Sequence, residues 1–186
     1  MANVKQKAKS EQGNQVVKRA QTILKYTTEM KSDFMSAYVG KNIGSLITLY
    51  GRIGGLLRLV QDNVQLSEMV EDWVSYNEKL AQHQLDEAEA VFEQIEMQSV
   101  NKVEVQVEIE RPEPLVSEWK VNHTSFTNLI RLMIKLDTFL VRSEEAYFKG
   151  LMTDVQMSSL NRQVGMVIDS YLERIMKATS PGKNRT

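Results

Sequence analysis

Apolar side chains recur at steps of three and four residues along most of the chain, which is the pattern of helices that bury one face. The spacing predicts helices over 16–34, 41–61, 68–98, 124–149 and from Thr153 to Ile175. Thr153 and Gln156 form a capping box that starts the last helix, and Gly150 marks the end of the preceding one. Four glycines within 41–61 predict either the close approach of another helix or a break near Gly54-Gly55.

The long helix over 68–98 carries two apolar stripes, and the second is shifted by one residue relative to the first. The first stripe consists of Leu66, Met69, Trp73, Tyr76 and Leu80, and the second of Ala81, Leu85, Ala88, Phe92 and Ile95. The sequence therefore predicts a local change in the face that this helix buries.

The period changes to two over 103–110, where valine and isoleucine alternate with glutamate and glutamine. This alternation predicts a strand that ends at Pro112 and Pro114, followed by a weaker extended segment over 116–121. A strand needs a partner for its backbone groups. It pairs either with 116–121 in a local hairpin or with the same strand of a second copy in an antiparallel ribbon.

These elements predict a mainly α fold: a helical domain with a short β-ribbon followed by two helices, assembled as a dimer. The predicted organisation is a disordered basic arm over 1–15, a helical domain over 16–100, a strand-helix-helix unit for DNA binding and dimerisation over 101–178, and a disordered tail over 179–186. An alternative is that 16–178 form one intertwined domain.

The composition is ordinary for a globular chain, with 42% hydrophobic and 25% charged residues. There is no cysteine, which excludes disulfides, cysteine-bound metals and thiol chemistry and fits a reducing compartment. No uninterrupted run reaches the roughly 18–20 apolar residues of a membrane span. We therefore expect a cytoplasmic protein with no membrane partner.

Charge is distributed unevenly although the formal net charge is only −1. Residues 1–60 carry +7, residues 61–118 carry −12 and residues 119–186 carry +4. Two basic ends around an acidic middle favour a polyanionic partner that is contacted by the ends.

Residues suited to catalysis are few. The only two histidines are His83 and His123, and neither lies in a motif of a nucleophilic triad. His83 with Glu87 provides too few ligands for a closed metal site. We expect no enzymatic activity, no metal and no cofactor.

Basic residues form two candidate phosphate contacts. Arg131, Lys135 and Arg142 share one face of the helix over 124–149, which is either an ordinary solvated face or a phosphate-facing edge. The N-terminal arm is either a solubilising tail or a nucleic-acid arm, and its basic residues are Lys5, Lys7, Lys9, Lys18 and Arg19.

The polar face of 103–110 is almost entirely acidic and would be repelled by phosphates. A DNA-reading ribbon is therefore expected at 118–123, where Lys120 and Asn122 are the candidates for contacts with base edges. Thr124 and Ser125, at the start of the next helix, would then lie over a phosphate.

Several segments, in this order, resemble a known family: GRIGGLLRLV, the acidic helix EDWVSYNEKLAQHQLDEAEAVFEQI, the valine strand VEVQVEIERP, then KLDTFLV and FKGLMTD. Over roughly 40–177, and at Trp73, Asp137, Gly150 and Leu151, the chain resembles the AcaB family of conjugative plasmids and integrating conjugative elements, formerly a domain of unknown function. The resemblance implies a bacterial transcriptional activator of transfer genes with a ribbon-helix-helix-like, dimeric DNA-binding fold.

The expected function is therefore a homodimeric, sequence-specific regulator of double-stranded DNA that is associated with the nucleoid or a plasmid. Its acidic helix would be available to RNA polymerase or to another regulator. The alternative is a helical adaptor or structural protein of a conjugation or secretion apparatus that binds no nucleic acid.

Overall fold

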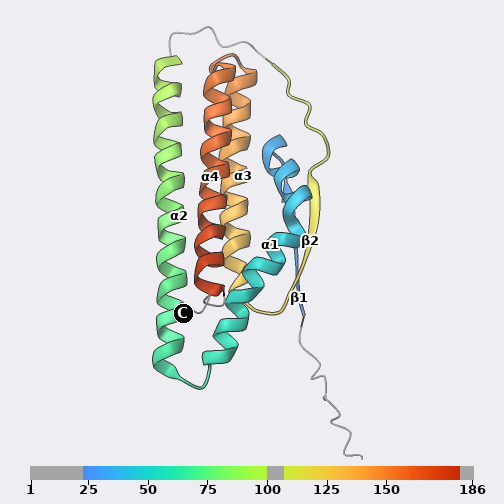
Figure 1. Ribbon diagram of the computed structural model, residues 1–186. Coiled ribbons are helices and arrows are strands. Elements are labelled where there is room, and N and C mark those ends of the chain that lie inside the picture. The colour runs from blue at the N-terminus through green and yellow to red at the C-terminus, as the bar shows by residue number, and fades with distance from the viewer. Residues whose placement is uncertain (1–22, 100–106, 181–186) are drawn as a thin grey trace, which may run out of the picture.

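The computed structural model describes residues 23–99 and 107–180, which contain four helices and two strands (Figure 1). The elements are β1 (Leu24–Met30), α1 (Asp33–Val60), α2 (Val64–Ser99), β2 (Leu115–Val121), α3 (Phe126–Phe148) and α4 (Asp154–Thr179). The mainly α prediction is confirmed. The chain thus contains two successive units, each of one strand followed by two helices.

The two strands pair with each other in an antiparallel two-stranded sheet, with Tyr26 opposite Trp119. The predicted hairpin of 103–110 with 116–121 is wrong, because the partner of β2 is β1, about 90 residues earlier in the chain. In the predicted strand, 103–106 lie outside the described residues, and 107–110 are in neither helix nor strand. The described ribbon is complete within one chain, so it needs no strand from a second copy.

The helix predicted over 16–34 is wrong over Leu24–Met30, which is a strand, whereas Asp33 and Phe34 begin α1. Residues 16–22 lie outside the described residues. The inward positions of this strand include Thr28, and because Thr28 is polar, the strand does not show the usual alternation of apolar and polar residues. The buried indole Nε1–H of Trp119 donates to Thr28 Oγ1 at 2.8 Å, which satisfies both groups. The β-branched Thr27 and Thr28 also favour a strand.

Helix α1 begins at Asp33 because Ser32 caps it, its hydroxyl accepting from Met35 N–H at 3.3 Å. The helix then continues to Val60 without the break considered at Gly54-Gly55. Close approach is the correct explanation for one glycine: a Cβ on Gly54 would lie 2.6 Å from the Cβ of His123. A Cβ on Gly44, Gly51 or Gly55 would meet open space.

The C-terminal helices follow the sequence closely. Gly150 ends α3 with φ +75°, a left-handed conformation that favours glycine. The Thr153–Gln156 capping box is present at the start of α4, with Gln156 N–H donating to Thr153 Oγ1 at 3.3 Å. Both predictions are confirmed.

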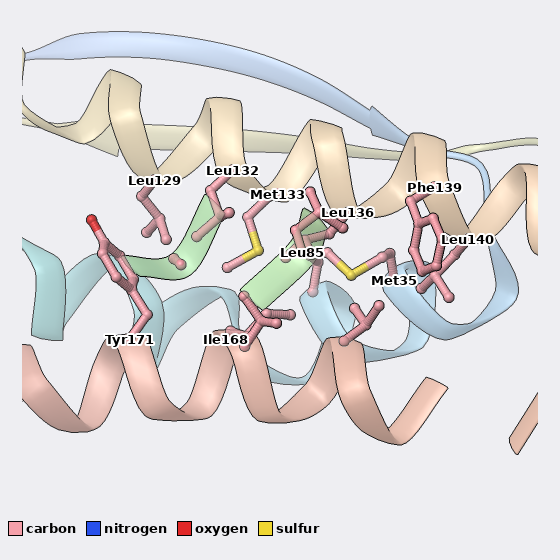
Figure 2. Close-up of a cluster of buried hydrophobic side chains, with 14 of the residues drawn as sticks. Met35, Leu85, Leu129, Leu132, Met133, Leu136, Phe139, Leu140, Ile168 and Tyr171 are labelled. Carbon is pink, nitrogen blue, oxygen red and sulfur yellow. The ribbon is translucent and has the colours of Figure 1, made fainter. Parts of the chain in front are cut away.

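The four helices and the inner face of the ribbon share one core (Figure 2). The close-up shows Met35 of α1, Leu85 of α2, Met133 and Leu136 of α3 and Ile168 of α4 pointing toward one another. Elements from both halves of the chain therefore contribute to the same interior.

Helix α1 also passes the length and composition test for a membrane-crossing helix, with a mean hydropathy of 1.3 in its most apolar window. The expectation that no segment is long and apolar enough to cross a membrane is therefore wrong for α1 by this test. Core helices pass the same test, and Leu46, Tyr50 and Ile53 of α1 are buried among the other helices.

Candidate nucleic-acid interface

The β1–β2 ribbon presents one face to solvent and packs the other on the helices. Its outer face consists of Lys25, Thr27 and Glu29 of β1 and Val116, Glu118 and Lys120 of β2, all exposed. In Figure 1 the ribbon lies along one side of the molecule, with α3 and α4 between it and α2. An exposed, two-stranded antiparallel ribbon has the dimensions that fit a DNA major groove.

The inner face holds the ribbon rigidly in place. Trp119 is fully buried, and its ring centre lies 6.0 Å from that of Phe126, the first residue of α3. The Tyr26 hydroxyl lies 3.0 Å from Thr127 Oγ1, one residue further along α3. These contacts fix the outward side chains relative to the start of α3, as a recognition surface requires.

Charge is graded along the outer face. Lys25 stands directly opposite Lys120, whereas Thr27 faces Glu118 and Glu29 faces Val116. Like charges directly opposite each other destabilise a strand pair unless an anion lies between them. One end of the ribbon, defined by Lys25 and Lys120, is thus suited to a phosphate or a guanine edge, and the other end is acidic.

Lys25 and Thr27 were missed by the sequence analysis because β1 was assigned to a helix. The signal that identifies them is the alternation of Lys25, Thr27 and Glu29 with Tyr26 and Thr28, once Thr28 is allowed to point inward. Lys120 was found, and the structure adds its cross-strand partner.

Asn122 and Lys120 line a hollow of about 420 Å³ beside the basic end of the ribbon. The other lining residues include Ile23 of the segment before β1 and Thr48 and Gly51 of α1. The Asn122 carbonyl accepts from Arg58 Nη1 at 3.3 Å, which ties this end of the ribbon to α1.

His123 has a structural position in the turn before α3. Its Nδ1 accepts from Ser125 N–H at 3.1 Å, and Ser125 Oγ lies 2.9 Å from the same nitrogen. Burial lowers the pKa of His123, and the Arg58 charge lowers it further, so the ring is neutral at pH 7. Thr124 is exposed at this helix start, whereas Ser125 is partly buried.

The stripe of Arg131, Lys135 and Arg142 lies where α3 faces α2. Lys135 Nζ donates to Gln82 Oε1 at 2.5 Å. The Arg142 guanidinium lies 5.4 Å from the ring centre of Phe92 and 3.9 Å from a Glu96 oxygen. Burial raises the pKa of Glu78, and the charge of Arg131 offsets part of that effect. Groups on α2 therefore engage this stripe, and the structure does not gather it with Lys120.

The arm residues Lys5, Lys7, Lys9, Lys18 and Arg19 lie outside the described residues. The described chain starts at Ile23, and Leu24 stands opposite Val121, next to Lys120. The arm is thus joined to the ribbon at its basic end.

Two carboxylates of α3 hold the turn between β1 and α1. Asp137, which is buried, accepts from Lys31 N–H, Ser32 N–H and the Ser32 hydroxyl at 2.8–3.1 Å. Glu144 accepts from Asp33 N–H at 2.8 Å and pairs with Arg111 at 2.5 Å. Burial raises the pKa of Glu144, and the bonds with Arg111 and the Asp33 N–H offset part of that effect.

Across residues 23–99 and 107–180, no three histidine, cysteine, aspartate or glutamate side chains are grouped to hold a metal ion.

Comparison with known proteins gives one structural match. No family model and no curated protein matches the chain. The crystal structure of selenomethionine-containing AcaB from uropathogenic E. coli superposes with a TM-score of 0.67 over 86% of this chain and 80% of that one. The chain has the fold of AcaB. The resemblance to AcaB predicted from the sequence is confirmed at the level of the fold, with 15% sequence identity.

Proposed function

We propose that this chain is a sequence-specific, double-stranded DNA-binding transcriptional regulator that acts as a homodimer and reads DNA with the β1–β2 ribbon. The observation that carries the proposal is the exposed ribbon with Lys25 opposite Lys120. The element order supports it. A strand followed by two helices is the repeating unit of ribbon-helix-helix proteins, and this chain contains two such units whose strands pair with each other.

Each outward group has a role in this proposal. Lys25 and Lys120 contact phosphates or guanine edges, and Thr27 and Asn122 contact bases. The exposed Thr124 at the start of α3 and the N-terminal arm contact phosphates. Glu29 and Glu118 repel phosphates, so the contact is centred on the basic end of the ribbon.

The wider role follows the AcaB-like fold. The proposed targets are the promoters of conjugative transfer genes, with the protein acting as an activator in the cytoplasm. Helix α2 lies on the far side of the molecule from the ribbon (Figure 1), and its exposed acidic residues are the proposed contact for RNA polymerase or another regulator.

The test is duplex selection from random sequence, followed by affinity measurements over a range of salt concentrations. Binding is expected to fall steeply with salt. Removing both ribbon lysines (Lys25→Ala with Lys120→Ala) should reduce the slope of log affinity against log salt by about 2, because two phosphate contacts are lost. Lys149→Ala, at the opposite end of α3, is the control and should leave the slope unchanged.

Selection that yields no enriched sequence, or affinity for duplex DNA that is flat from low to physiological salt, would contradict a DNA-reading function. It would favour the adaptor alternative. Sequence-specific binding that is unaffected by the double lysine variant would place the reading surface elsewhere on the molecule.

A further inference from the structure

The two strands of the ribbon pair within one chain, so the proposed homodimer does not need a shared ribbon and can form through another surface. We propose that two copies pair through the first half of α2, as an antiparallel helix pair. The pairing surface, called here the α2 seam, consists of Leu66, Met69, Trp73, Tyr76 and Leu80.

The spacing of the α2 seam is that of a coiled coil. Its residues follow one another at steps of three, four, three and four, which places them in one line of alternating a and d positions. At a rise of 1.5 Å per residue the seam is about 21 Å long. A strict a/d line is the narrow pattern that a helix shows to a single partner helix.

The fold itself leaves much of this seam uncovered. Met69 is 66% exposed, Tyr76 63% and Leu66 45%, while Trp73 is partly buried against the core. The core uses a different face of α2, which includes Val74, Ala81 and the later stripe. The sequence predicted that α2 changes the face it buries. In the structure one apolar face of α2 packs in the bundle, and a second apolar face is left largely exposed by its own chain.

Aromatic residues and methionine are the types enriched where proteins meet. Trp73, Tyr76 and Met69 together supply the large, partly rigid contact area that such interfaces use as anchors. They lie on α2, and α3 and α4 stand between α2 and the ribbon (Figure 1).

The charges beside the α2 seam identify the partner as a second copy. Lys79 is the one basic residue of α2, if histidine is counted as neutral, and Asp72 lies seven residues before it on the same edge of the seam. Both side chains are exposed, and neither has an ion pair in the described part of the chain. A surface with one acid and one base seven residues apart is complementary to its own antiparallel copy.

The antiparallel register follows from the seam. If Trp73 packs against the partner's Tyr76, then Asp72 stands opposite the partner's Lys79, and the two-fold axis repeats the pair. A parallel pair would set Asp72 and Lys79 against uncharged edge positions, the buried Asn77 and the half-buried Gln84. A longer antiparallel overlap would bring the later acids of α2 against one another.

The test is sedimentation of the full chain without DNA, over a range of concentrations. Tyr76→Glu buries a carboxylate in the seam and should raise the dimer dissociation constant by at least about tenfold. Met97→Glu is the matched control. Met97 is 71% exposed and continues the line of Tyr76 on the same helix, but it lies beyond the overlap, so dimerisation should be unchanged.

Charge exchange tests the register. Asp72→Lys and Lys79→Asp should each weaken the dimer, because each sets like charges opposite one another twice. The double exchange should restore it. Circular dichroism of each variant establishes that α2 remains folded.

A chain that is monomeric at all concentrations overturns the proposal, as does a dimer that survives Tyr76→Glu or an exchange that fails to restore pairing. The inference concerns the dimer of the proposed regulator, but its test contains no DNA. A monomer that still selects a DNA sequence would overturn the α2 seam alone, and a dimer that selects none would overturn the DNA-binding function alone.

Discussion

The turn between β1 and α1 depends on a single carboxylate, and its removal gives a quantitative prediction. Asp137 projects from α3, is buried, and accepts from the Lys31 N–H, the Ser32 N–H and the Ser32 hydroxyl. Asp137→Ala would leave these donors without their acceptor. It would also release Ser32, which caps α1, from its tertiary anchor.

The magnitude follows from which donors water can reach. Lys31 is exposed, so solvent can replace the bond to its N–H. Ser32 is fully buried, and its N–H and hydroxyl lie 2.9 and 2.8 Å from Asp137 Oδ1. Each buried hydrogen bond to a charged acceptor contributes about 1.5–3 kcal/mol. We expect Asp137→Ala to lower the free energy of unfolding by about 3–5 kcal/mol.

The assay is urea unfolding followed by circular dichroism, with hydrogen exchange to locate the effect. The denaturant slope should be unchanged, because the same surface is exposed on unfolding. Protection should fall first at the amides of 31–36. Asp86→Ala is the matched control: Asp86 is exposed on α2 and, among the described residues, accepts only from Gln82, so its loss should cost less than about 0.5 kcal/mol.

A loss below about 1 kcal/mol for Asp137→Ala, or unchanged protection at 31–36, would refute the view that this carboxylate holds the turn. Asp137→Asn refines the test. The amide retains one oxygen acceptor but no charge, so about half of the loss is expected.

Two further predictions concern α1 and α2. Gly54→Ala should destabilise the fold by about 1–3 kcal/mol in urea unfolding, because the new Cβ would lie 2.6 Å from that of His123. Gly51→Ala, where the new Cβ meets open space, should stabilise the fold by up to about 1 kcal/mol. Equal effects of the two substitutions would contradict the close packing at Gly54. Burial raises the pKa of Glu78 above 4.5, and Arg131 offsets only part of this. The folded state therefore holds this proton to higher pH than the unfolded state, and the contribution of Glu78 to stability falls as pH rises through that window. Glu78→Gln should flatten the dependence of stability on pH above about pH 4.5, and an unchanged profile would contradict the burial argument.

The helices could be predicted because their stripes are mostly apolar. The second stripe of α2 and the line from Leu129 to Leu140 in α3 are buried as their spacing indicates. Short sequence signals at the helix ends were equally reliable, because the Thr153 capping box and Gly150 act through the backbone of their own neighbours.

The extended segment predicted over 116–121 is confirmed as β2, but β1 and its pairing with β2 could not be predicted, because both strands hide their inward faces. Thr28 and Ser117 point inward although they are polar, and only the tertiary bond from Trp119 makes Thr28 acceptable there. The segment with the clearest alternation, by contrast, forms no strand over 107–110. Periodicity reports which residues could be buried, and strand pairing across about 90 residues depends on contacts that periodicity does not contain.

Only part of the candidate site was predicted, because strand pairing cannot be read from the sequence pattern. Lys120 was identified from its own strand, but a facing lysine is visible only when the register of β1 is known. The basic stripe on α3 shows the opposite case, since a local pattern singled out residues that α2 engages through Gln82, Phe92 and Glu96. Charge along a sequence therefore gives the sign of a partner, whereas register and helix packing decide which charges remain available to it.

The uneven charge of the chain acquires a spatial meaning in this fold. Helix α2, which carries most of the acidic residues, lies on the far side of α3 and α4 from the ribbon (Figure 1). Glu71, near the start of α2, is an exception, because its charge reaches His123 beside the basic end of the ribbon. DNA reading and self-pairing then use separate surfaces. Because the ribbon is complete in one chain, a variant that is monomeric through Tyr76→Glu should retain binding to a single site. It should lose only the gain in affinity that comes from linking two ribbons.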